Sequence, residues 1–424
     1  MLKPLHESLG IATVGVGGGV ATTAAAGIEL IRLGETGLDG LPLAETLGRD
    51  GLVPYAGLRF AGWDLDGADL ASAARTHRVV PDERLERVAE ALGATEPWPA
   101  VADAEYCRNV TGEHIQRENS RRAMVARVQS DLARFEAEMG AGRVVVINLA
   151  STERVPDMDA PALQSLAAFE RGLDENDPAI SPAMVYAYAA IERGFPYGNF
   201  TPNVAAEIPA LIELAKERGV PTAGRDGKTG QTFLKTVLAP AFRARALRVE
   251  GWYSTNILGN RDGQALSDSG SLASKLGTKG DVLDDMLGYK VGDHIVQISY
   301  YPPRGDEKEA WDNIDVTGFL GQRMQVKVNF LCRDSILAAP LVIEIARCLD
   351  LARRRGEAGP IEALSTFFKA PMTAGGAPEH AFFTQQRTLM RWLMAENLDH
   401  VLSDEPAAPA KPDVVSAAPL APVK

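Results

Sequence analysis

Two features of the sequence could carry chemistry: a glycine-rich turn near its start and a set of lysines in its second half. The turn, Gly15 to Gly19, would let the amides at a helix N-terminus approach a pyrophosphate without side-chain obstruction. The strict dinucleotide fingerprint has a third glycine at position 20, which is Val20 here. Taken alone, the turn is as consistent with tight strand-to-helix packing as with a dinucleotide site.

Four lysines stand in short polar segments, namely Lys275, Lys279, Lys308 and Lys369. Lys275 and Lys279 are one helical turn apart, so both ammonium groups could face one ligand. Burial beside other cations lowers the pKa of a lysine and makes a neutral amine accessible as a proton acceptor, while a charged neighbour stabilises an oxyanion. For each lysine alone, a solvated surface charge is the simpler explanation, so only the set is informative.

Asp64 ends a strand predicted over residues 58–63 and could accept hydrogen bonds from an adenosine ribose, which favours NAD over NADP. It lies 49 residues after Gly15, far beyond the roughly 20 of the fingerprint, so the connection between them must loop out. The Gly-Lys-Thr at 227–229 is similar to a nucleotide-binding phosphate loop, but the required glycine five residues earlier is Thr222. A ligand-lining loop after a strand over 220–223 is the better interpretation.

The elements around these residues are typical of an α/β fold. A β-branched strand from residue 10 leads into the glycine turn, and an alanine-rich helix follows over residues 22–33. A strand over residues 143–148 is apolar between its polar ends, as expected for a parallel strand covered on both faces. A long charged helix is predicted over residues 113–139.

The pattern changes between about residues 247 and 334, where longer β-rich runs occur. The last of them, over residues 324–332, alternates polar and apolar side chains, which predicts a half-exposed antiparallel sheet in an inserted α+β domain. Helices are predicted to resume over residues 335–355 and 379–402. The Ala- and Pro-rich end of the chain is typical of a disordered tail.

Composition excludes several classes of function. The chain has 44 Lys and Arg against 56 Asp and Glu, a net charge of −12, which argues against a nucleic-acid surface but allows a locally basic pocket. Three scattered cysteines are too few for a disulfide framework or a thiolate zinc site, so we expect a cytoplasmic protein. The apolar run over residues 10–26 is too short and interrupted for a membrane span and lacks a cleavage motif.

Short motifs spread from about residue 10 to residue 371 resemble the inositol-3-phosphate synthase family, also called the myo-inositol-1-phosphate synthase family. They are Gly62-Trp63-Asp64, Thr152-Glu153-Arg154, Ile180-Ser181-Pro182, Gly230-Gln231-Thr232, the segment from Leu258 to Gly263, the segment from Val282 to Met286, the segment from Gly305 to Lys308, Asp334-Ser335 and Lys369-Ala370-Pro371. Each is short, but their number and order make coincidence a poor explanation.

The resemblance implies a Rossmann-like NAD-binding domain with an inserted α+β catalytic and oligomerisation domain. The expected divisions are residues 1–235 for the first part of the NAD-binding domain, 236–337 for the insertion, 338–402 for a helical return and 403–424 for the tail. It also implies a homotetramer formed through the inserted sheet, with no nucleic-acid or membrane partner.

The activity implied is the isomerisation of glucose 6-phosphate to inositol 3-phosphate. NAD oxidises carbon 5, carbon 6 becomes an enolate and attacks the aldehyde at carbon 1, and the hydride then returns to carbon 5. Two alternatives stay open: an NAD-dependent sugar-phosphate dehydrogenase that releases NADH, and a non-catalytic regulator that binds NAD or a sugar phosphate.

The family's active-site residues match the four lysines and Asp334. The resemblance assigns Lys275 to proton exchange at the carbon 5 oxygen, Lys308 and Lys369 to stabilising the enolate and alkoxide, Lys279 to phosphate or oxyanion binding and Asp334 to orienting a lysine. The expected NAD-binding residues are Gly15, Gly17, Gly18, Gly19, Val20, Asp64, Ala150, Ser151, Thr152, Thr201, Asp226, Thr229, Asn260, Asp262 and Asp306. No metal is expected, because no ligand cluster demands one.

The glycine turn departs from the family pattern. The family has two asparagines where this chain has Gly19 and Val20, and a glycine where it has Ala21. Backbone contacts to a phosphate survive this change and side-chain amide contacts do not, so cofactor affinity or geometry is expected to differ.

Overall fold

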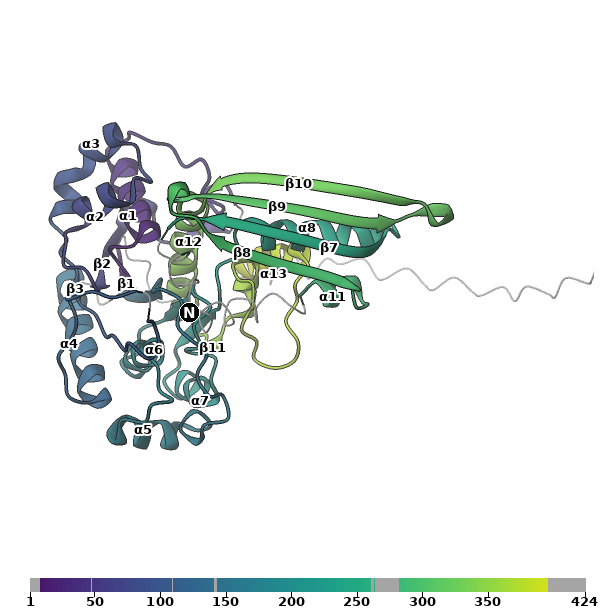
Figure 1. Cartoon of the computed structure of the whole chain (residues 1–424). Helices are drawn as coiled ribbons and strands as arrows, with labels where there is room; N and C mark the ends of the chain where they lie inside the picture. Colours follow the sequence, from purple (N-terminus) through teal and green to yellow (C-terminus); the bar gives the residue numbers. More distant parts are fainter. Residues whose placement is uncertain are drawn as a thin grey trace, which may run out of the picture.

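The computed structural model describes residues 8–395, except for residues 47, 109, 141–142, 261–262 and 264–281. Two β-sheets dominate it: a parallel sheet enclosed by helices, and a long sheet that extends to one side (Figure 1). The predicted lysines Lys275 and Lys279, the predicted cofactor residue Asp262 and the predicted tail lie outside the described residues. No helix among the described residues has the length and apolar character needed to cross a bilayer.

The parallel sheet has, within the described residues, seven strands in the order β11-β6-β5-β4-β1-β2-β3. Their bounds are β1 Leu9–Val14, β2 Leu58–Asp64, β3 Trp98–Pro99, β4 Val144–Asn148, β5 Tyr197–Asn199, β6 Pro221–Gly224 and β11 Gly359–Pro360. All the paired strands run parallel, and every residue of β1 and β4 is buried. The α/β fold and the three strands expected near the site are therefore confirmed.

Helices cover both faces of this sheet. The helices of the described residues are α1 Gly19–Arg32, α2 Leu70–His77, α3 Asp82–Gly93, α4 Arg121–Met139, α5 Leu166–Glu175, α6 Pro182–Glu192, α7 Pro209–Glu217, α8 Gly230–Ala244, α11 Val282–Leu287, α12 Asp334–Arg355 and α13 Phe382–Met394, and of these α8 and α11 pack on the second sheet instead. Short 3-10 turns lie at Arg49–Gly51, Tyr55–Gly57, Pro161–Leu163, Pro302–Arg304, Phe319–Gly321 and Glu362–Phe367. One core packs α4 and α6 against β1 and β4, and a second packs α12 against the opposite face.

Two predicted helices differ from the structure. Helix α4 begins at Arg121 and not near residue 113, because Ser120 caps it by accepting a hydrogen bond from the Ala123 amide at 3.1 Å. The residues before it are extended, because they form a short β-bridge with the segment at Ala100. The Ala100 amide donates to the His114 carbonyl, and the Gln116 amide donates to the Ala100 carbonyl. Helix α13 covers only Phe382–Met394 of the predicted 379–402, and residues beyond 395 lie outside the described part.

The second sheet has the order β10-β9-β7-β8, with β7 Arg248–Leu258, β8 Asp293–Tyr300, β9 Glu307–Thr317 and β10 Arg323–Arg333. β9, a strand that was not predicted, pairs antiparallel with both β7 and β10, so the antiparallel character predicted for this sheet holds for these pairs. The antiparallel prediction is wrong for β8, which pairs parallel with β7. β8 begins beside the N-terminal half of β7, with Asp293 opposite Gly251, and runs in the same direction. Helices α8 and α11 pack on one face, around Trp252, Phe242 and Leu283.

A buried ionic network holds the long connection between α1 and β2 against α12. Glu344 is fully buried, and its Oε1 accepts hydrogen bonds from the Tyr55 hydroxyl at 2.6 Å and the Leu43 amide at 3.1 Å. Its Oε2 accepts one from Arg347 at 2.5 Å, and the Arg347 guanidinium lies 3.9 Å from the centre of the Tyr55 ring. Arg347 also donates to the carbonyl of Val53 at 2.7 Å.

Replacing Glu344 should therefore destabilise the protein strongly. Glu344→Ala leaves the Arg347 guanidinium buried without its carboxylate, and we expect a loss of about 3–5 kcal/mol in the free energy of unfolding. Urea denaturation would measure it, with Glu217→Ala on the exposed end of α7 as the matched control, expected to stay within about 0.5 kcal/mol of wild type. A Glu344→Ala variant as stable as the control would contradict this account.

Candidate active site

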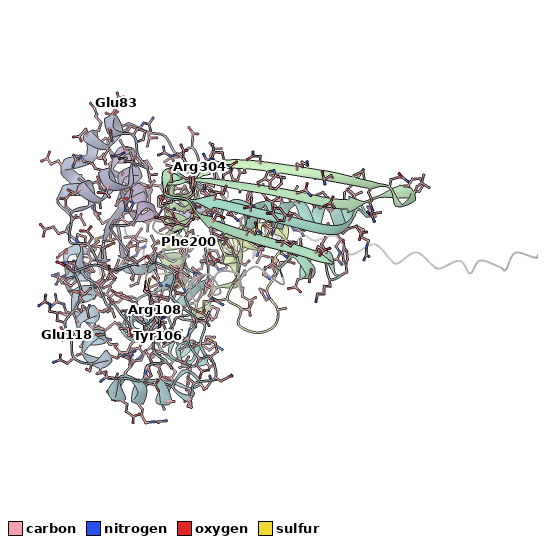
Figure 2. All side chains as sticks on the ribbon, viewed as in Figure 1. Glu83, Tyr106, Arg108, Glu118, Phe200 and Arg304 are labelled. Carbon is pink, nitrogen blue, oxygen red and sulfur yellow. The ribbon has the colours of Figure 1, made fainter. Side chains whose placement is uncertain are left out.

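A cavity of about 610 Å³ opens at the carboxyl ends of the parallel strands. Its floor follows β1, β2 and β4, where strand order reverses on either side of β1, which is the usual ligand site of an open parallel sheet. The inserted sheet closes the other side with residues from the ends of β7, β9 and β10. Phe200, labelled in Figure 2 where the two sheets meet, also lines the cavity.

Most of the predicted residues meet in this cavity. Those that line it are Gly15, Gly18, Gly19, Val20, Asp64, Ala150, Ser151, Thr152, Thr201, Asp226, Thr229, Asn260, Asp306, Lys308, Asp334 and Lys369. Gly17 does not line it, because its amide is turned to the Asp64 carboxylate at 2.9 Å. Residues more than 300 positions apart in the sequence thus border one space.

The glycine turn has the geometry of a cradle. Gly15 has a φ of 84°, and a Cβ there would stand 3.0 Å from the carbonyl oxygen of Leu149, so a side chain is excluded. No side chain among the described residues caps the start of α1 at Gly18. Asp64, 6% exposed, holds the turn through Gly17 while its carboxylate borders the cavity.

Buried asparagines at strand ends shape the next part of the wall. Asn148 ends β4 and accepts a hydrogen bond from the Ala150 amide at 3.0 Å, and Asn199 ends β5 and accepts one from the Thr201 hydroxyl at 2.7 Å. Asn203 in turn accepts from the Glu153 amide at 2.8 Å. These three positioning residues were not predicted, although a polar residue that ends an apolar strand is a usable signal.

Glu153 is a buried acid on the wall of the same cavity. Burial raises the pKa of its carboxyl to about 8, although the Ala183 amide donates to it at 3.1 Å. The group therefore holds a proton near neutral pH, and it ties the Thr152 loop to the start of α6 without adding charge to the cavity.

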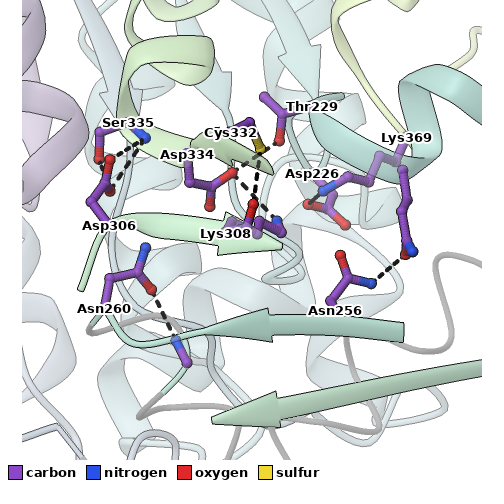
Figure 3. A network of polar contacts seen from close by, with 12 residues as sticks. Asp226, Thr229, Asn256, Asn260, Asp306, Lys308, Cys332, Asp334, Ser335 and Lys369 are labelled. Atoms are coloured by element: carbon purple, nitrogen blue, oxygen red, sulfur yellow. Dashed lines mark hydrogen bonds and ion pairs between the residues drawn. The ribbon is translucent and has the colours of Figure 1, made fainter. Parts of the chain in front are cut away.

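The two described lysines of the predicted set are each paired with a carboxylate (Figure 3). Lys369 Nζ lies 2.8 Å from Asp226 Oδ1, and Lys308 Nζ lies 3.3 Å from Asp334 Oδ1. The Thr229 hydroxyl also lies 3.4 Å from Asp334 Oδ1. All five side chains border the cavity, so an anionic ligand there would meet cations already held in place.

Asp306 and Ser335 form a second polar contact at the start of α12. The Ser335 hydroxyl donates to Asp306 at 2.6 Å and its amide donates at 3.1 Å, which fixes the loop before β9 against α12 (Figure 3). Burial raises the pKa of the Asp306 carboxyl. Asn260, also predicted, accepts a hydrogen bond from the Gly263 amide at 3.2 Å.

The loop between β6 and α8 is held by backbone hydrogen bonds to the segment that carries Lys369. The Lys369 amide donates to the carbonyl of Asp226 at 2.7 Å, and the Lys228 amide donates to that of Phe367 at 2.8 Å. Gly227 is required because a Cβ there would lie 2.0 Å from the Phe200 ring. The loop lines the cavity with Asp226, Gly227 and Thr229, where a ligand-lining loop would have to lie.

Lys228 points away from the cavity and was not predicted to matter. It is 4% exposed, its ammonium donates to Gln385 of α13, and it lies 5.7 Å from the centre of the Phe382 ring. Burial lowers the pKa of Lys228 to about 7. Lys235, likewise buried and 2.8 Å from His294, has its pKa lowered to about 8 by burial.

Among the described residues, no group of three His, Cys, Asp or Glu side chains is arranged to hold a metal ion. The polar side chains that line the cavity carry ammonium, carboxylate, hydroxyl, amide and imidazole groups.

A protein-family model named for NAD binding and described as myo-inositol-1-phosphate synthase matches residues 51–394. This chain belongs to the myo-inositol-1-phosphate synthase family. Inositol-3-phosphate synthase 1 of Bacteroides thetaiotaomicron is 42% identical, over 92% of this chain and 96% of that protein. Inositol-3-phosphate synthase 1 of rice, Oryza sativa subsp. japonica, is 28% identical, over 78% and 69%.

Solved structures agree with this membership in the synthase family. The crystal structure of inositol-3-phosphate synthase from Caenorhabditis elegans matches with a TM-score of 0.86 and 26% identity, over 96% of this chain and 90% of that chain. A myo-inositol-1-phosphate synthase-related protein from Thermotoga maritima shares the fold, with a TM-score of 0.75 and 24% identity over 91% and 98%.

NAD is the cofactor of the synthase family, and the residues of the cavity fit it. The cradle at Gly15 and the uncapped start of α1 suit a pyrophosphate, and Asp64 at the end of β2 stands where a ribose hydroxyl would need an acceptor. The cofactor residues themselves remain assigned by resemblance.

The buried Lys228 predicts a pH dependence of stability. Its pKa is about 7 in the folded chain against 10.5 for a free lysine, so the unfolded chain binds more protons between these values and wild-type stability rises across this window. Below pH 7 Lys228 is protonated in both the folded and the unfolded chain, so the free-energy cost of burying its charge no longer changes with pH. Lys228→Met removes this titration.

Urea midpoints at pH 6 and pH 9 would measure the effect. The stability difference, wild type minus Lys228→Met, should increase from the lower to the higher pH, while the same difference for Lys216→Met, at an exposed lysine of α7, should stay flat. An equal difference at the two pH values would show that the amine stays charged in the folded chain and would contradict the prediction.

Proposed function

We propose that this chain is an inositol-3-phosphate synthase, which converts D-glucose 6-phosphate to 1D-myo-inositol 3-phosphate with NAD recycled in each turnover. The observation that carries the proposal is that Lys308 and Lys369, each beside a carboxylate, border the same cavity as the glycine turn. A sugar phosphate lying between them would have its reacting carbons beside cations and within reach of a nicotinamide.

The bound cofactor supplies hydride acceptance from carbon 5 of the sugar and its later return to the same carbon. The described lysines of the cavity contribute electrostatic stabilisation of the reacting sugar. Lys308 and Lys369 stabilise the negative charge that develops on sugar oxygens in the enolate and in the alkoxide of ring closure. Asp334 and Asp226 hold these ammonium groups in place.

The remaining proton transfers are assigned from the family resemblance. Lys275 takes the proton of the carbon 5 hydroxyl and gives it back at the final reduction, and Lys279 binds phosphate or an oxyanion. The substrate phosphate takes the proton from carbon 6. Protons and hydride thus return to the sugar, and the net reaction is an isomerisation.

The domain division and the assembly belong to the same proposal. Residues 1–235 and 338–402 form the NAD-binding part, and 236–337 form the catalytic insertion and tetramerisation domain. The insertion has an open face, because the odd-numbered side chains of β9 point away from α8. This face carries Trp311 and Tyr253, with ring centres 5.8 Å apart, and Ile295, which is 46% exposed.

A cytoplasmic location is supported by the cysteines. All three, Cys107, Cys332 and Cys348, are free thiols, and two of them are buried. A reducing compartment would keep them in this form.

Removing one lysine should slow the reaction strongly without abolishing cofactor binding. Lys369→Ala is expected to lower kcat by about 10²–10³, as for loss of one oxyanion-stabilising donor. Phosphorus and proton NMR of a mixture with glucose 6-phosphate and NAD would identify the product, and absorbance would follow NADH. Lys216→Ala, at an exposed lysine of α7, is the control and should retain full activity.

The alternatives give other results in the same assay. Stoichiometric NADH with an open-chain keto product would indicate a dehydrogenase that releases its cofactor. NAD binding with no turnover of glucose 6-phosphate by wild type would indicate a non-catalytic regulator.

The assembly has its own test. Wild-type protein should scatter light as four copies of the 45.4 kDa chain. Ile295→Asp with Trp311→Asp places two charges on the open face and should lower the mass. A wild-type mass of one chain would contradict the tetramer.

A further inference from the structure

The order of the strands decides over which part of the sheet each half of NAD lies. The pyrophosphate is expected at the glycine turn after β1, and Asp64, the expected acceptor for the adenosine ribose, ends β2 on one side of β1. On the other side of β1 lie β4, β5 and β6, in that order. The nicotinamide half therefore extends over the carboxyl ends of β4 and β5.

Phe200 is the first residue after β5 and brings an aromatic ring to this part of the cavity. The residue is half-buried and lines the cavity, where the two sheets meet (Figure 2). The indole of Trp63 and the phenol of Tyr186 also line the cavity, but they stand together at β2, with ring centres 5.0 Å apart. Phe200 is therefore an aromatic group at the nicotinamide end, and it was not predicted from the sequence.

The neighbouring backbone holds the Phe200 ring in one place. The Phe200 amide donates to the Asn148 carbonyl at 3.0 Å, and the Phe200 carbonyl accepts from the Gly227 amide at 2.8 Å. A Cβ on Gly227 would lie 2.0 Å from Cζ and 2.2 Å from Cε1 of the ring, so the ring fills the space that a side chain at position 227 would take. A group fixed in this way loses little freedom when a ligand packs on it.

We propose that Phe200 packs against the nicotinamide ring of NAD and fixes where that ring lies. Nicotinamide is planar and aromatic, and contact between two aromatic rings is favourable beyond the apolar area that it buries. Leu149 after β4 and Val20 in α1 also line the cavity and pack on the same core as Phe200, so they continue its apolar surface towards the glycine turn. A sugar phosphate suits this surface less, because its hydroxyl groups and phosphate need polar partners that these three side chains do not offer.

This inference rests on NAD as the cofactor and not on the proposed reaction. It is tested by binding without turnover, so it and the proposed function can fail separately. Phe200→Ala removes the ring, and Phe200→Leu removes its aromatic character but leaves an apolar side chain against Gly227. Phe383→Ala is the matched control, because Phe383 on α13 is 63% exposed and is not among the described residues that border the cavity.

Titration calorimetry with NAD and with ADP-ribose, which lacks the nicotinamide, measures the contact. Phe200→Ala should bind NAD about tenfold more weakly than wild type, as for loss of one aromatic pair and its buried area. Phe200→Leu should show a smaller loss for NAD. Both variants should bind ADP-ribose with the affinity of wild type, and Phe383→Ala should match wild type for both ligands.

The comparison of the two ligands separates contact with the cofactor from a structural role. An equal loss for NAD and ADP-ribose in both Phe200 variants would mean that the ring only supports the wall of the cavity. An unchanged affinity for NAD in Phe200→Ala would mean that the ring does not touch the nicotinamide. Either result would overturn the proposal.

Discussion

Helix α12 is the constraint on which the site depends. It leaves the inserted sheet at the end of β10, so its first residues, Asp334 and Ser335, border the cavity while its middle packs against the parallel sheet. Glu344 lies ten residues further on, about 15 Å along the helix, and is buried with Arg347. Any rotation of the helix would break the hydrogen bonds of Glu344 with Tyr55 and of Arg347 with the Val53 carbonyl, both of which lie outside the helix. The interactions that fix where Asp334 meets Lys308 therefore lie far from the chemistry.

The lysine–aspartate pairs show how an acidic protein can offer a cationic site. Lys308 and Lys369 are mostly buried, and a buried ammonium is costly without a charged partner. A carboxylate lies beside each ammonium of the cavity. The net charge of −12 describes the whole chain and does not report this arrangement.

Local patterns were enough to predict β1, β2, β4 and β6, but not β5 or the asparagines that end β4 and β5. Asp64 and the glycine turn follow apolar runs, and both lie where a parallel sheet places them. The parallel pairing of β8 could not be predicted, since alternation of side chains is the same for both strand directions. β9 was missed because its polar face makes Glu307 to Glu309 look like a loop. The Lys228 side chain points away from the cavity because it bonds Gln385 of α13, which lies more than 150 residues later in the sequence, so local patterns could not predict its orientation.

The path of the chain has a consequence for its synthesis. The parallel strands from β1 to β6 are complete by residue 224, but α12, which covers Leu9, Ile11, Val145 and Ile147 on one face, ends at residue 355. A ribosome adding about 5–20 residues per second needs on the order of ten seconds for the roughly 130 residues between. For that time one apolar face of the nascent sheet has only α1 and the connection after it as cover and lacks α12, so this interval is when we expect the chain to be most prone to aggregation.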